Sequence, residues 1–92
     1  MNYITKDKTI IFSPKFNEEI EHKLLEKYSI VIFSYYELNE DLFKCYEKND
    51  FKNSKYIGST FNQQVNLPPN LTHLTFGGYF NQQVNLPQNL TH

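Results

Sequence analysis

Four stretches of this chain follow one order of apolar and polar positions. Each has an apolar residue and a small one, two or three variable positions, then Phe or Leu, Asn, two polar residues and an aliphatic residue. The stretches are IIFSPKFNEEI (10–20), VIFSYYELNEDL (31–42), YIGSTFNQQV (56–65) and TFGGYFNQQV (75–84). A pattern with a period of about twenty residues predicts stacked repeats, in which each unit covers the apolar side of its neighbour.

The alignment of the four stretches defines three sets of equivalent residues. We interpret the two apolar sets as core, and the Asn set as amides that satisfy backbone groups in successive turns. The sets are Phe12, Phe33, Ile57 and Phe76; Phe16, Leu38, Phe61 and Phe80; and Asn17, Asn39, Asn62 and Asn81.

Alternation within the stretches predicts which side chains point into the core of each strand. In NLTHLTF, Leu74 and Phe76 are expected to point inward, which leaves His73 and Thr75 on the outer face of the sheet. The same alternation puts Ile10, Phe12, Val31 and Phe33 inside and Thr9, Ile11, Ile30 and Ile32 outside.

The third stretch departs from this alternation. Around Ile57 the frame would bury Lys55 and expose Tyr56. Either the register shifts by one residue there, or the Lys55 side chain reaches past the edge of the sheet into solvent.

The segments between the strands differ along the chain. After Asn17, apolar residues at helical spacing predict a helix capped by Asn17, and EDLFKCYEKN after Asn39 repeats this pattern. The acidic pairs Glu18-Glu19 and Glu40-Asp41 fit the helix dipole better than acid–base catalysis. After Asn62 and Asn81, Pro and Asn favour irregular backbone. We therefore expect an α/β solenoid: a parallel sheet of four to five short strands, helices on the outer side of the N-terminal half, and irregular connectors in the C-terminal half.

The two most regular units, STFNQQVNLPPNLTHLTFG and GYFNQQVNLPQNLTH, resemble FNIP repeats. These repeats belong with the leucine-rich repeats and are abundant in social amoebae and in large DNA viruses that infect amoebae. The close resemblance covers Ser59 to His92, with Gln63-Gln64 and Gln82-Gln83 where the signature has Ile-Pro, and residues 9–58 share only the general frame. It implies stacked parallel strands used for protein contact and no catalytic residues. We expect one domain, 1–92, with degenerate repeats at about 9–29 and 30–53 and regular ones at about 54–72 and 73–92.

Composition limits the classes of partner. The net charge is -1 and there is no Arg, which argues against nucleic acid as a partner. No stretch has the length that crosses a bilayer, and Cys45, as the single cysteine, forms no internal disulfide. We expect a cytoplasmic protein, in the host cytoplasm if it is viral.

We find no nucleophile with a base, no metal cluster and no phosphate loop, so we expect neither enzyme activity nor a cofactor. His73 and His92 occupy equivalent positions and could stand on adjacent strands, but two ligands make a weak metal site that His22 has no reason to join. We expect no bound metal.

The outer face of the sheet is the candidate for protein binding. Several neighbouring apolar side chains on a surface indicate a contact site. The candidate residues are Ile11, Ile30, Ile32, Tyr56, His73 and Thr75.

The chain ends after the second NLTH without a capping unit, which indicates a fragment of a longer protein or a homodimer formed through the uncapped C-terminal repeat. All nineteen charged residues lie between Lys6 and Lys55, so charge does not oppose self-association of the later repeats. We expect a non-enzymatic protein-interaction module that self-associates. The alternative is a vestigial or purely structural repeat fragment with no dedicated ligand.

Overall fold

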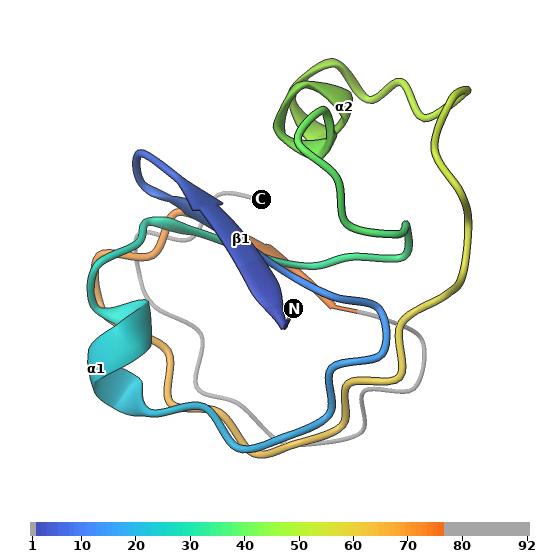
Figure 1. Ribbon diagram of the computed structural model, residues 1–92. Helices are drawn as coiled ribbons and strands as arrows, with labels where there is room; N and C mark the ends of the chain where they lie inside the picture. Colours follow the sequence, from blue (N-terminus) through green and yellow to red (C-terminus); the bar gives the residue numbers. More distant parts are fainter. Residues whose placement is uncertain (1, 77–92) are drawn as a thin grey trace.

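The computed structural model describes residues 2–76 of the 92. Within them, the fold is a small α/β structure around a four-stranded sheet (Figure 1). Along the chain, the elements are β1 (Tyr3–Lys6), β2 (Thr9–Phe12), α1 (His22–Leu25), β3 (Ile30–Phe33), α2 (Leu42–Lys48) and β4 (His73–Thr75).

The strands lie in the order β1-β2-β3-β4. β2, β3 and β4 are parallel, as expected, but β1 runs antiparallel to β2. The expectation of a purely parallel sheet is therefore wrong for its first strand. The hairpin turns through Asp7 and Lys8, and Asp7 adopts the left-handed φ of 53° that Asp tolerates better than most residues. This short hairpin forms one edge of the sheet.

The parallel strands align in a register that stacks equivalent residues. Phe12 lies opposite Phe33, and Leu74 lies opposite Val31. As predicted, Ile10, Phe12, Val31 and Phe33 are completely buried. Leu74 and Phe76 are partly buried and pack against the same core.

Five phenylalanines form what we call the aromatic ladder: Phe12, Phe16, Phe33, Phe61 and Phe76. The Phe33 ring stacks on Phe12 at a centroid distance of 5.0 Å and on Phe76 at 5.2 Å. The Phe61 ring stacks on Phe33 at 4.1 Å and on Phe16 at 5.9 Å. Offset stacking of this kind adds to the free energy of burying the rings.

The segments that leave β2 and approach β4 run side by side (Figure 1). The backbone N–H of Thr60 donates to the carbonyl of Pro14 at 3.0 Å. The Asn17 side-chain oxygen accepts from the backbone N–H of Asn62 at 2.8 Å and from the Gln63 amide at 3.0 Å. The predicted role of the Asn set is thus confirmed for Asn17, whose side-chain oxygen satisfies the backbone N–H of Asn62.

The equivalence of residues 31–42 with the other stretches is wrong beyond β3. Asn39 bonds locally, because its side chain accepts from the N–H of Asp41 at 2.8 Å just before α2. Leu38 packs with a separate apolar cluster instead of the ladder, and Ile57 is 37% exposed outside the sheet. Phe80 and Asn81 lie outside the described residues.

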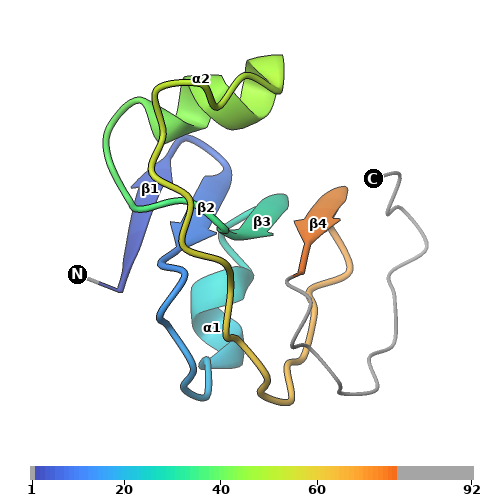
Figure 2. The same ribbon diagram turned by 90° about the vertical axis from the view of Figure 1, so that its right-hand side faces the viewer.

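The two helices cover opposite faces of the sheet (Figure 2). α1 contributes Leu25 to the core that contains the ladder, and α2 contributes Leu42 to a cluster on the other face. α1 begins at His22, later than expected, and its N-cap residue is Glu21, so the predicted Asn17 cap is wrong. Between Ser59 and Thr72 the backbone is irregular, as the Pro and Asn residues predicted.

Candidate protein-binding groove

A segment of 24 residues is inserted between the end of β3 and the part of the chain that returns to the aromatic ladder. Phe12 and Phe16 are four positions apart, whereas their stacking equivalents Phe33 and Phe61 are 28 apart, which leaves 24 extra residues. We call residues 35–58 the insertion. It contains α2 and carries this helix onto the face of the sheet that the sequence pattern predicts to be open.

The insertion changes the environment of the predicted isoleucines. Ile11 is 0% exposed and Ile32 is 6% exposed, so the expectation that these side chains face solvent is wrong. Both pack with Leu42 of α2, and Ile30 lies at the margin of this cluster, partly buried. Inward and outward side chains alternate as predicted, but α2, which follows β3 in the chain, covers the outward set.

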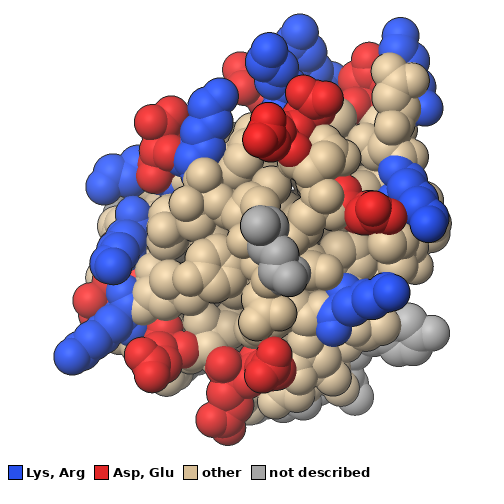
Figure 3. All heavy atoms as spheres, in the orientation of Figure 1, with Lys and Arg blue, Asp and Glu red and all other residues tan. Residues whose placement is uncertain are grey.

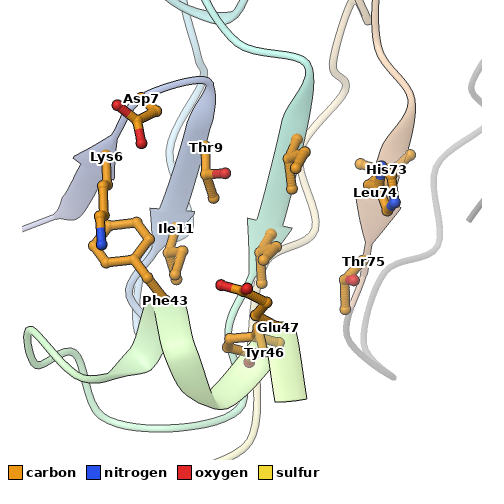
Figure 4. Close-up of a pocket in the computed structure, with 12 residues that line it drawn as sticks. Lys6, Asp7, Thr9, Ile11, Phe43, Tyr46, Glu47, His73, Leu74 and Thr75 are labelled. Atoms are coloured by element: carbon orange, nitrogen blue, oxygen red, sulfur yellow. The ribbon is translucent and has the colours of Figure 1, made fainter. Parts of the chain in front are cut away.

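α2 does not cover the whole face, and a groove of about 510 Å³ remains between it and the sheet (Figure 4). Five of the six predicted binding residues line it: Ile11, Ile30, Ile32, His73 and Thr75. The sequence analysis missed the other lining residues, which are Lys6, Asp7 and Thr9 of the β1–β2 hairpin, Leu74 of β4, and Phe43, Tyr46 and Glu47 of α2. The alternation placed Thr9 on the outer face and Leu74 on the inner one, whereas no periodic signal connects the α2 residues with the sheet.

Tyr56, the sixth predicted residue, lies outside the groove lining. It is 67% exposed, forms an isolated antiparallel bridge with Tyr36, and contacts the rings of Tyr35 and Tyr36 edge-on. Lys55 is not buried either, because its side chain is 76% exposed and lies 3.7 Å from the Glu37 carboxylate. This segment therefore belongs to the insertion and not to the four-stranded sheet.

A hydrogen-bond network fixes α2 over the sheet. The Tyr46 hydroxyl donates to the Ser34 hydroxyl at 2.9 Å and accepts from the backbone N–H of Tyr35 at 3.2 Å. Ser34 is completely buried at the point where the insertion leaves β3, and its hydroxyl also bonds the backbone of Tyr36. Burial raises the pKa of the Tyr46 phenol above its ordinary value of 10.0, and the Ser34 hydrogen bond opposes this shift.

Few of the residues that line the groove are charged. Lys6 and Asp7 come from the β1–β2 hairpin and Glu47 comes from α2, whereas β4 carries no acidic or basic residue apart from His73. On the side of the molecule where β1 lies, Lys, Asp and Glu surround a centre that is largely uncharged (Figure 3). Because most of its lining residues are uncharged, the groove suits apolar and uncharged polar groups.

Residues 2–76 contain two of the three histidines, each with a polar partner nearby. No group of three or more His, Cys, Asp or Glu residues that could hold a metal ion is found there. His73 contacts the Thr72 hydroxyl at 2.9 Å, and His22 lies 3.0 Å from the Glu26 carboxylate; His92 is outside the described residues. Within the same part of the chain, no helix has the length and apolar character needed to span a bilayer.

Comparison with known families finds one match. Residues 61–92, about a third of the chain, match the family model of the FNIP repeat. The described part of this segment includes Phe61 of the ladder, the Asn62 backbone that bonds Asn17, and strand β4. No curated protein and no solved structure matches the chain.

Proposed function

We propose that this chain, whose residues 61–92 carry an FNIP repeat, is a non-enzymatic protein-interaction module built as a leucine-rich-repeat-like solenoid. In repeat proteins of this kind, stacked units create an extended face, and partners bind to that face. The in-register strands β2, β3 and β4 and the hydrogen bonds between Asn17 and Asn62 support such stacking.

The observation that carries the proposal is the groove beside β4. Ile30, His73 and Thr75 are partly exposed in it, and the buried side chains of Ile11 and Ile32 lie at its bottom. A concave site with an apolar floor and a few polar groups is the usual form of a binding site. We assign to it a partner that presents apolar or uncharged polar side chains, because β4 brings no acidic or basic residue other than His73.

A second copy of the chain is the first partner to test. Residues 56–92 contain no Asp, Glu, Lys or Arg, so two copies of this half do not repel each other through charge. The expected dimer through the C-terminal repeat involves residues outside the described part of the chain, and the groove offers a surface that can be tested directly.

The experiment compares Thr75→Lys with Asn53→Lys by light scattering over a range of micromolar concentrations. Both variants add one positive charge, but Thr75 lines the groove whereas Asn53 is exposed on the insertion. We expect the wild-type protein and Asn53→Lys to associate as concentration rises and Thr75→Lys to remain monomeric. A wild-type protein that is monomeric at every concentration rules out self-association.

A heterologous partner is tested with the same pair of variants. A protein captured stoichiometrically by the wild-type chain and by Asn53→Lys, but not by Thr75→Lys, supports the groove as the binding site. Equal capture by all three proteins places the contact elsewhere and contradicts the assignment.

A further inference from the structure

The insertion begins and ends at one point, where two short segments pair. The carbonyl of Tyr35 accepts hydrogen bonds from the N–H groups of Ile57 at 2.7 Å and Gly58 at 2.9 Å. The N–H of Glu37 donates to the carbonyl of Lys55 at 2.9 Å. The segment therefore leaves and rejoins the rest of the fold through a narrow neck.

The neck is itself held to the sheet. The Tyr35 hydroxyl donates to the carbonyl of Phe76 at 2.8 Å, directly after β4. Gly58 adopts a φ of 89°, which only glycine reaches without strain, at the position where the chain turns back toward the ladder. These contacts fix the two ends of the insertion independently of α2.

Beyond the neck, the insertion has an aromatic cluster of its own. The Phe51 ring stacks on Tyr36 at a centroid distance of 4.2 Å and meets Tyr46 edge-on at 4.8 Å. The Cys45 sulfur lies 3.5 Å from the Ser54 hydroxyl. All of these residues belong to the insertion, so the contacts persist if the whole segment moves as one body.

The contact between the insertion and the sheet is smaller than the core on the other face. Among residues 2–76, the cluster under α2 has three buried residues, Ile11, Ile32 and Leu42, of which Leu42 belongs to the insertion, and the other insertion residues that pack there are partly buried. In the same part of the chain, the core that contains the aromatic ladder has nine buried residues. Regions with few buried apolar contacts open at a lower free energy than the global unfolding of the protein.

We propose that residues 35–58 form a lid, which swings away from the sheet about its neck while the aromatic ladder stays folded. Opening exposes Ile11 and Ile32 and extends the groove across β2 and β3, so the lid controls how much of the sheet face is accessible. This inference concerns the internal mechanics of the chain and does not rest on the proposed function.

Hydrogen exchange on the full-length chain tests the lid. Leu42→Ala removes the one fully buried side chain that the lid places against the sheet. Leu42 loses these contacts both when the lid opens and when the whole chain unfolds, so we expect amides 46–48 of α2 and amides 31–33 of β3 to exchange about 30-fold faster or more, with the α2 amides remaining the less protected. The single thiol, Cys45 on α2, should also react faster with a thiol reagent in this variant.

Leu25→Ala is the matched control, because Leu25 is also completely buried but packs in the core of the ladder. In this variant we expect the β3 amides to exchange about 30-fold faster or more while the α2 amides keep their wild-type rates, because Leu25 stays packed when the lid alone opens. If Leu25→Ala accelerates β3 and α2 by the same factor, the two parts unfold as one unit and the lid proposal is wrong.

A milder variant covers the case in which Leu25→Ala unfolds the chain. Ile10→Val removes one methyl group from the completely buried core of the ladder and leaves the contacts of the lid in place. Faster exchange in β3 with no change in α2 supports the lid. Exchange that accelerates equally in α2 and β3 overturns it.

Discussion

Replacing Phe61 with Ala tests the aromatic ladder at a ring that is completely buried and stacks on Phe33 at 4.1 Å. The change removes about 3 to 5 kcal/mol of stability, the usual cost of truncating a buried Phe. A protein of 92 residues has a free energy of unfolding of about 5 to 14 kcal/mol. The variant therefore loses a large share of its stability.

Urea denaturation followed by circular dichroism measures this loss. With an m value of about 1.5 kcal/mol/M, the midpoint should fall by about 2 to 3 M. Phe51→Ala is the matched control, because Phe51 is partly buried and stacks on Tyr36 within the insertion. Its expected cost is smaller, about 1 to 2 kcal/mol. A loss below about 1 kcal/mol for Phe61→Ala would falsify the ladder as the centre of the core.

A double-mutant cycle then distinguishes the observed stacking from the alignment of the sequence stretches. Phe33→Leu and Phe61→Leu should show a coupling energy of about 0.5 to 1.5 kcal/mol, because their rings stack. Leu38→Ala and Phe61→Leu should be additive within about 0.5 kcal/mol, since the two side chains lie in separate clusters. Strong coupling between Leu38 and Phe61 would restore the equivalence that the alignment assigns to them.

Three further predictions concern single groups. Asn17→Ala should cost about 0.5 to 1.5 kcal/mol in urea denaturation, because the N–H of Asn62 loses its acceptor, and Asn17→Asp, which keeps an acceptor, should cost less. Gly58→Ala should cost about 1 to 2 kcal/mol, since the position is open but its φ is 89°, and a neutral result would contradict that backbone conformation. The pKa of Tyr46 is raised in the folded protein, so its contribution to stability is present below pH 10 and is lost as the pH rises through the folded pKa. Between pH 10 and 11, the stability of Tyr46→Phe should therefore fall less steeply than that of the wild type, and equal slopes would exclude the effect.

Local pattern was sufficient to predict the strands that stack. The alternation around Phe12, Phe33 and Leu74 predicted β2, β3 and β4 with the correct inward residues. The repeat pattern did not predict the antiparallel strand β1, because the first residues of the chain lie outside the repeat. The β1–β2 hairpin is a local feature. The alternating segment YITK followed by Asp7-Lys8 is a pattern typical of a hairpin.

The insertion shows where the repeat pattern misleads. Leu38 and Asn39 follow β3 with nearly the spacing of Phe16 and Asn17 after β2, so an alignment assigns them to the same sets. The chain instead returns to the ladder only at Phe61. The match covers four positions: an apolar residue, a small residue, Phe or Leu, and Asn. It does not distinguish Leu38 from Phe61 as the equivalent of Phe16, because the choice depends on which side chain fills the space beside Phe33.

The amino-acid sequence alone determined the inward face of each parallel strand, the irregular connector before β4 and the resemblance to FNIP repeats, because these depend on side chains close together along the chain. Only the tertiary structure decided that 24 residues are inserted after Ser34, that α2 lies on the outward face, and that Ile11 and Ile32 are buried. Burial of an outward-facing side chain depends on what packs against it from elsewhere in the chain, and such a contact between distant segments leaves no periodic trace in the sequence.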